Sequence, residues 1–256
     1  MPKLSERERK WFVYVLLATS FTFSISQSSM TTIYPTLMHR FSVPIASVQW
    51  LTTGFMLIMV LMMPLSPWFL KNMSFKSFFI GLQAIFIIGT LIAINAGNFL
   101  ILMAGRLLEG VSVGLLFPSF QSVILSITKE ELRPEAMGKV GLVMGSALAV
   151  GPIVSGIMLQ IFNWQAVFAF FLFILILLTI LAFIFIKDVM PREAYKFDFV
   201  SSVSLIGLLM ILYSLQTMTR SFNYQLLIVL IVGIILFSYF VHRQFSIKIR
   251  CWICVF

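Results

Sequence analysis

The stretch Leu102-Met103-Ala104-Gly105-Arg106-Leu107-Leu108-Glu109-Gly110 lies inside an apolar segment that runs from residue 99 to residue 127. Such a segment is long enough to cross a bilayer as one helix. Arg106 and Glu109 are three residues apart, so they share one face of that helix and can pair. A charge inside hydrocarbon is costly and is normally kept only where it faces protein or a wet cavity. No other predicted span carries a charged residue at its middle, so we look for function at this pair.

The composition predicts an all-α integral membrane protein. The chain has 256 residues, of which 60% are hydrophobic and 11% are charged, and its mean hydropathy is +1.04. A soluble domain of this length needs far more charge to cover its surface. Apolar runs of roughly 18 to 25 residues, separated by short polar loops, instead predict eight transmembrane helices.

These spans predict a six-helix bundle over residues 11–186, followed by two further transmembrane helices within 199–241. Residues 1–10, the linker 187–198 and the tail 242–256 are expected to lie in the cytosol, and the tail is expected to be truncated. We expect the first span to end at Pro35 and the second to cover residues 45–70 and end near its prolines. The sixth span, 166–186, is almost entirely Phe, Leu and Ile, and we expect it to face lipid.

The net charge of +9 reflects membrane topology, and nucleic acid is not an expected partner. In an eight-span arrangement, all Lys and Arg residues except Arg40, Arg106 and Arg220 fall in segments on the same side of the membrane as the N-terminus. Basic loops are retained on the cytosolic side. Both termini are therefore expected in the cytosol, and the main partner is the lipid bilayer.

An enzymatic function has no support in the sequence. Cys251 and Cys254 form a Cys-x-x-Cys at the C-terminal end, but no second pair of metal ligands accompanies them, and we interpret the spacing as incidental. There is also no nucleophile–base set and no phosphate-binding loop. No metal and no cofactor is expected.

Polar side chains mark two of the spans. Ser24, Gln27 and Thr31 recur at helical spacing along the first span. Together with Gln49 and Thr53 of the second span, they are the predicted lining of a substrate cavity. Hydroxyl groups in helices also bond to their own preceding turn, and this alternative stays open.

The fifth span is rich in small residues. Gly141 and Gly145 form a Gly-x-x-x-Gly, which allows close approach of two helix backbones. Gly151, Pro152 and Gly156 follow, and a proline in mid-helix removes a hydrogen bond and bends the helix. A packing surface and a hinge are both consistent with this pattern.

Five motifs in order resemble the drug:proton antiporter branch of the major facilitator superfamily, whose members have fourteen transmembrane helices. The motifs are Gln49 to Phe55, Arg106 to Gly114, Gly145 to Gly156, Asn163 to Phe168 and Phe197 to Phe199. The resemblance implies a multi-pass protein of the bacterial cytoplasmic membrane.

The sequence departs from that pattern at several places. Ser26 stands where the branch usually has an Asp in its first helix, and Lys71 stands where an Asp is expected in the second loop. Glu109 replaces a common Gln, and Gln165 replaces a common Arg. Family members also carry a further six-helix bundle that is missing here.

The resemblance implies proton-coupled efflux of lipophilic, cationic, drug-like molecules, with the proton gradient as the energy source and rocking of two halves around a midplane site. The 27 Phe and 15 Met residues suit an adaptable apolar binding surface. Coupling requires a titratable group in the membrane, and Glu109 is the only acid within a predicted span. Our hypothesis is that Glu109 alternates between a proton and the substrate while Arg106 tunes its affinity.

Two alternatives remain open. Arg106 and Glu109 are also consistent with a static structural ion pair. The chain as a whole is also consistent with a truncated, non-transporting N-terminal fragment, or with a half-transporter that needs a separate C-terminal half or a second copy as its partner.

Overall fold

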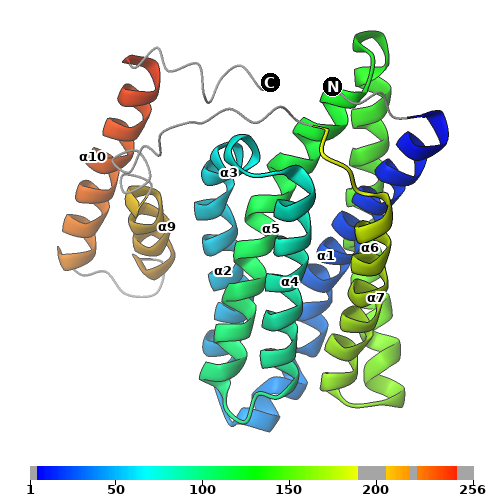
Figure 1. Cartoon of the computed structure of the whole chain (residues 1–256). Helices are drawn as coiled ribbons and strands as arrows, with labels where there is room; N and C mark the ends of the chain where they lie inside the picture. Colours follow the sequence, from blue (N-terminus) through cyan, green and yellow to red (C-terminus); the bar gives the residue numbers. More distant parts are fainter. Residues whose placement is uncertain (1–4, 190–205, 219–223, 247–256) are drawn as a thin grey trace.

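The computed structural model describes residues 5–189, 206–218 and 224–246. These residues form helices joined by short loops, and they contain no strand (Figure 1). The elements are α1 (Glu6–Phe41), α2 (Ile45–Met62), η1 (Met63–Leu65), α3 (Ser66–Asn72), α4 (Phe75–Ile94), α5 (Phe99–Ile127), η2 (Glu130–Leu132), α6 (Arg133–Ile161), α7 (Trp164–Phe185), α9 (Ile206–Met218) and α10 (Tyr224–Ser246).

Five segments are long and apolar enough to cross a membrane: Ile45–Asn72, Phe75–Ile94, Phe99–Ile127, Glu130–Ile161 and Trp164–Phe185. The expectation of an all-α membrane protein is therefore confirmed. α1 is longer than any of these but is less apolar, because it carries many serines and threonines. Most of these polar side chains are buried against other helices: Thr19, Ser20, Thr22, Ser24, Ser26 and Ser29.

The expectation that the first span ends at Pro35 is wrong. α1 continues through Pro35 and ends at Phe41. Ser42 caps the helix: its backbone φ is 51°, and its N–H donates to the carbonyl of Met38. A proline removes only one helical hydrogen bond. The turns on either side hold because Ile33 and Leu37 are buried in the bundle.

The second span, expected to end near its prolines, continues past them to Asn72 with an interruption at Pro64. α2 ends at Met62, the 3₁₀ turn η1 contains Pro64, and α3 begins with Pro67 in its first turn. Proline suits the first turn of a helix because the missing N–H has no intrahelical partner there. The buried hydroxyls of Ser66 and Ser119 lie 2.7 Å apart and join α3 to α5.

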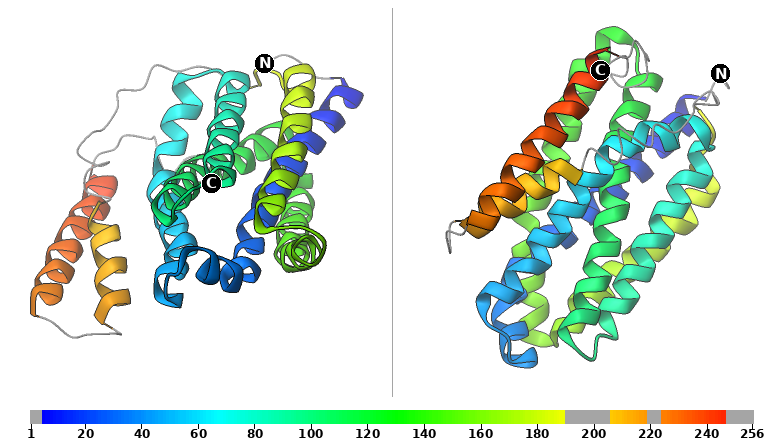
Figure 2. Two further views of the ribbon diagram at one scale, coloured as in Figure 1. Left: turned by 90° about the horizontal axis from the view of Figure 1, so that it is seen from below. Right: turned by 90° about the vertical axis from the view of Figure 1, so that its left-hand side faces the viewer.

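The six-helix bundle consists of two groups of three helices. α5 packs between α2 and α4, while α1 packs against α6 and α7 (Figures 1 and 2). The groups meet where α4 contacts α7 and where α1 contacts α2 and α5. Phe23 of α1 stacks on Phe86 of α4 with ring centroids 4.2 Å apart. α5 is thus the central helix of one group.

The sixth span, expected to face lipid, is only partly exposed. One face of α7 is buried in the bundle: Trp164, Val167, Phe168, Phe171, Leu175 and Ala182. Another face is exposed: Phe173, Ile176, Leu177, Ile180, Phe183 and Ile184. Because every face of this helix is apolar, its sequence does not distinguish the packed face from the exposed one.

α9 and α10 pack against each other as a pair. A Cβ at Gly207 would lie 2.7 Å from the Gly233 carbonyl oxygen, so these glycines allow the two backbones to approach closely. Tyr213 of α9 lies beside Trp50 of α2, with ring centroids 6.3 Å apart. The two cysteines and most of the predicted linker and tail lie outside the described residues.

Candidate functional site

Arg106 and Glu109 form an ion pair in the first half of α5, and neither side chain is exposed. Arg106 Nη1 donates to Glu109 Oε2. The Thr90 hydroxyl of α4 lies 2.9 Å from Glu109 Oε1 and 2.9 Å from the Phe86 carbonyl oxygen, so its single proton serves one acceptor at a time. The prediction that the two charged residues share a helix face and pair is confirmed.

Glycines bring two helices close enough to enclose this pair. On the α4 side, a Cβ at Gly105 would lie 2.6 Å from the Gly89 carbonyl oxygen, and a Cβ at Gly89 would lie 3.0 Å from Glu109 Cγ. On the α2 side, a Cβ at Gly110 would lie 2.8 Å from the Phe55 carbonyl oxygen. At Gly114 a Cβ would overlap the Met59 carbonyl oxygen. The backbones of α4 and α2 therefore enclose the charges of Arg106 and Glu109.

Phe55 of α2 covers the guanidinium group. The Arg106 Cζ atom lies 4.4 Å from the centroid of the Phe55 ring, and a cation is attracted to the face of an aromatic ring. The glycine four positions after Arg106 thus has a structural role, because Gly110 allows α2 to come close enough to place this ring.

The site has spare hydrogen-bonding capacity. Within the described part of the chain, Nε and Nη2 of Arg106 have no hydrogen-bond partner. An arginine carries five N–H donors, and buried donors are nearly always satisfied. Unpaired donors on a fully buried arginine indicate a site that can accept a further acceptor group.

The five predicted cavity residues differ in burial, and their role as a cavity lining stays a prediction. Ser24 is buried between α1 and α6, where its hydroxyl lies 3.0 Å from the Ser20 carbonyl oxygen and 3.5 Å from Met144 Sδ. Gln27 and Thr53 are half-buried, and Thr31 and Gln49 are exposed. None of the five lines either of the two pockets at α1.

Serine hydroxyls join α1 to the backbone of α6. Ser28 Oγ lies 3.1 Å from the Ala147 carbonyl oxygen, and Ser29 Oγ lies 3.0 Å from the Gly151 carbonyl oxygen. Both hydroxyls also lie within hydrogen-bond distance of the Ile25 carbonyl oxygen of their own helix, at 3.1 and 2.8 Å, so each proton serves one acceptor at a time. Gly151 is the α6 glycine at this contact, since a Cβ there would overlap the Ser28 side chain. Ser29 was not among the polar positions singled out from the sequence.

The other small residues of the fifth span do not make the predicted contact. In the described chain nothing lies within 4 Å of a Cβ placed at Gly141, Gly145 or Gly156. Pro152 is exposed, and α6 is continuous through it. The close approach expected at the Gly-x-x-x-Gly is therefore found one and a half turns further on, at Gly151.

Thr90, Gly89 and Phe55 contribute to the site, and the sequence alone did not place them there, although Phe55 ends the motif that begins at Gln49. Gly89 and Thr90 are a small and a polar residue in an otherwise apolar span, which is a weak signal. A phenylalanine in a chain with 27 of them carries none.

A membrane-spanning helical bundle with a sealed ion pair in one of its helices is an arrangement suited to a secondary transporter. The model of the Major Facilitator Superfamily matches residues 16–247, and the chain belongs to that family.

Similar curated proteins are named as MFS-type transporters or as resistance proteins. The chain is 32% identical to the uncharacterized MFS-type transporter YcnB of Bacillus subtilis over 244 residues. The aligned segment covers 94% of this chain and 52% of that protein. It is 31% identical over 241 residues to the lincomycin resistance protein LmrB of the same organism, over 91% of this chain and 50% of that protein. A multidrug resistance protein B homolog of Mycobacterium tuberculosis is 29% identical over 177 residues, 67% of this chain and 31% of that protein.

Solved structures share the fold. A peptide transporter POT in complex with sulfate matches with a TM-score of 0.68 at 15% identity, over 92% of this chain and 53% of that chain. The human organic anion transporter MFSD10 matches with a TM-score of 0.65 at 14% identity, over 90% of this chain and 70% of that chain. This chain spans about half the length of the curated relatives it matches first.

Proposed function

We propose that this chain carries out proton-coupled export of lipophilic, cationic drugs, as a member of the fourteen-helix antiporter branch of its family. Relatives named for lincomycin and multidrug resistance support an efflux role. The basic residues near the start of α1, the end of α5 and the start of α6 support cytosolic termini in a bacterial cytoplasmic membrane.

The observation that carries the proposal is the sealed pair of Arg106 and Glu109. A proton that binds Glu109 neutralises the carboxylate and removes its attraction to Arg106. The Thr90 hydroxyl then turns to the Phe86 carbonyl, which is equally near at 2.9 Å. Arg106 remains charged, with Nε and Nη2 already unpaired. The protonated and ionised forms of Glu109 therefore favour different arrangements of α2, α4 and α5, and an alternating-access transporter requires such a bias.

The test is efflux of a fluorescent lipophilic cation from cells that produce residues 1–256, with and without a proton uncoupler. We expect uncoupler-sensitive efflux from the parent chain and none from Glu109→Gln, which keeps the size of the side chain but cannot ionise. Glu131→Gln is the matched control, because Glu131 is an exposed acid in η2. If Glu109→Gln inserts normally and retains uncoupler-sensitive efflux, the coupling role is wrong.

A second candidate is a half-transporter that is inactive alone. The observation that favours it is that the chain spans about half of its relatives. In this case residues 1–256 insert in the membrane without producing efflux. Co-production of a C-terminal half from a relative, or fusion of two copies in tandem, restores efflux, and that efflux again requires Glu109.

A further inference from the structure

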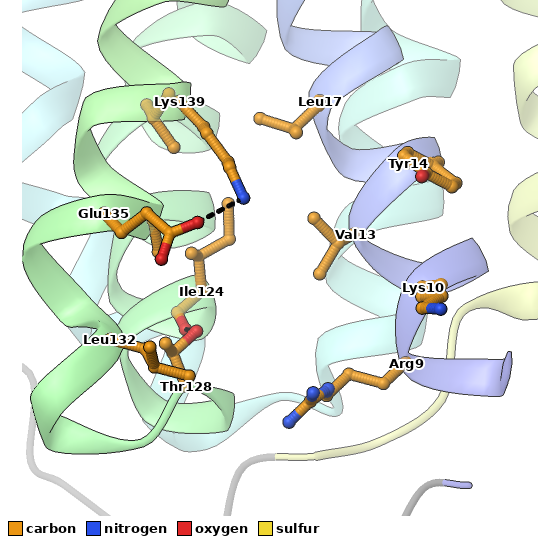
Figure 3. A pocket seen from close by; sticks show the side chains of 12 residues that line it. Arg9, Lys10, Val13, Tyr14, Leu17, Ile124, Thr128, Leu132, Glu135 and Lys139 are labelled. Carbon is orange, nitrogen blue, oxygen red and sulfur yellow. Dashed lines mark hydrogen bonds and ion pairs between the residues drawn. The ribbon is translucent and has the colours of Figure 1, made fainter. Parts of the chain in front are cut away.

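A pocket of about 530 Å³ opens between α1, the end of α5 and the start of α6, at the same end of the bundle as the N-terminus (Figure 3). This volume lies within the range of roughly 300–1,000 Å³ that is typical of small-ligand sites. Figure 3 shows α1 on one side and α6 on the other, with Arg9, Val13 and Leu17 along the α1 wall. The pocket shares no residue with the Arg106–Glu109 site.

The charges of the lining favour an anion. Arg9, Lys10 and Lys139 carry three positive charges, and Glu135 carries the one negative charge. Glu135 is held by Lys139, with Nζ 2.7 Å from Oε1. Arg9 and Lys10 have no ion-pair partner in the described part of the chain. The excess positive charge repels a lipophilic cation, so this pocket does not suit the drugs proposed above.

Most of the remaining lining is apolar and accommodates a hydrocarbon chain. Val13 and Leu17 follow Arg9 at successive turns of α1. Further apolar side chains come from Ile124, Leu132, Ala136 and Val140, and hydroxyl groups come from Tyr14 and Thr128. A ligand that places an anionic head beside Arg9 and Lys10 thus has an apolar surface for its tail along the same helix. This combination of an anionic head and an apolar tail describes a phospholipid.

We propose that the pocket binds a phospholipid with an anionic head group, drawn from the membrane leaflet at this end of the bundle. Basic pockets between transmembrane helices at a membrane interface bind anionic head groups. Arg9 and Lys10 contact the head group. Lys139 either leaves Glu135 and binds the phosphate, or stays paired with Glu135 at the edge of the pocket. Binding at this site is independent of the coupling role proposed for Glu109.

The experiment measures lipid retention by native mass spectrometry on the purified full-length chain, with phosphatidylglycerol and phosphatidylcholine offered at equal concentration. We expect phosphatidylglycerol to be retained in preference. The double variant Arg9→Gln with Lys10→Gln is expected to lower that retention tenfold or more, since each basic group near a membrane surface contributes about 1 kcal/mol. Lys129→Gln removes one positive charge from the adjacent loop, outside the pocket, and is expected to leave retention unchanged.

Two further arms separate the pocket from general surface charge and from other ligands. Leu17→Trp fills the apolar wall without a change of charge, and we expect it to lower phosphatidylglycerol retention as well. Equal retention of both lipids, an equal loss in Lys129→Gln, or no loss in Leu17→Trp would overturn the proposal. Binding of soluble dodecyl phosphate without binding of phosphatidylglycerol would overturn the assignment to a lipid.

Discussion

The two central helices of the bundle are held to their neighbours in different ways. α5 meets α2 and α4 mainly through glycines, and it carries one sealed ion pair. Within the described residues it makes a single serine bond to the backbone of α4, from Ser112 Oγ to the Leu82 carbonyl at 2.6 Å. α1 meets α6 through serine hydroxyls that donate to backbone carbonyls. In a membrane the hydrophobic effect does not drive helices together, so close packing and interhelical hydrogen bonds do.

The two regions differ in the free energy that is needed to bury their polar groups. The serine contacts of α1 are neutral, and each is worth a fraction of a kcal/mol. The pair in α5 places two charges where an unpaired charge is severely penalised. We therefore expect substitutions at α5 to be more destructive than those at α1, and the following predictions test this order.

The largest effect is expected for Arg106→Leu, which leaves Glu109 buried without its partner. Loss of one member of a buried pair costs about 3–5 kcal/mol. The measurement is the free energy of unfolding from detergent titration of the purified protein in mixed micelles. The double variant Arg106→Leu with Glu109→Leu removes both charges and is expected to recover most of the loss. A double variant as unstable as the single one would show that the unpaired charge is not the cause.

The second effect concerns the glycine contact. Gly105→Ala places a Cβ 2.6 Å from the backbone of Gly89, and overpacking of this kind costs about 1–3 kcal/mol. Gly81 is the matched control on α4, since nothing lies within 4 Å of its Cβ position. Gly81→Ala is expected to be neutral or slightly stabilising in the same titration. If both variants lost the same free energy of unfolding, the close approach of α4 and α5 at Gly105 would not be the cause.

A smaller effect is expected at α1. Ser29→Ala removes a hydroxyl that reaches the Gly151 carbonyl of α6, and such interhelical bonds contribute about 0.6 kcal/mol on average. Ser146→Ala serves as the control, because that hydroxyl bonds only to Val143 of its own helix in the described chain. A loss at Ser29 as large as that of Arg106→Leu would reverse the proposed order of the two regions.

The smallest effect is expected at the surface pair that joins the start of α1 to the segment after α7. Lys187 Nζ lies 2.7 Å from Glu8 Oε1. The hydrogen bond from Lys187, aided by the N–H of Ser5, lowers the pKa of Glu8 from 4.5 to about 2. Because the folded-state pKa is the lower one, the stabilisation is fully present above pH 4.5 and is lost as the pH falls toward 2.

Thermal midpoints of the parent chain and of Glu8→Gln, measured between pH 6 and pH 2, test this pair. The small difference at pH 6 is expected to disappear at the acid end, and a difference that grows as the pH falls would contradict the assignment. Exposed pairs contribute little, so this effect ranks last.

Part of the site could be predicted from the sequence because charge and spacing are local properties. Arg106 and Glu109 stand out as charged residues within an apolar span, and a separation of three residues places them on one helix face. The partners Thr90, Gly89 and Phe55 come from other helices, and their contribution depends on which faces meet. The same limit explains α7, whose apolar sequence is uniform although only part of its surface is packed.

The glycines of α6 illustrate the limit in a second way. Gly141, Gly145, Gly151 and Gly156 look alike in sequence, yet only Gly151 lies against α1. Pro35 and Pro152 look like breaks, yet α1 and α6 continue through them, because the surrounding turns are held by their own hydrogen bonds and neighbours. Pro64, by contrast, does accompany a 3₁₀ turn.

The sequence by itself determined the membrane class, the order of the helices and the position of the buried charges. These follow from the length of apolar runs and from the cost of placing a charge in hydrocarbon, both of which act on single segments. Only the tertiary structure decided which helices enclose the pair, which glycine is a contact and where a basic pocket opens. Those features depend on the rotation of each helix about its axis, which is settled by packing between segments far apart in the chain.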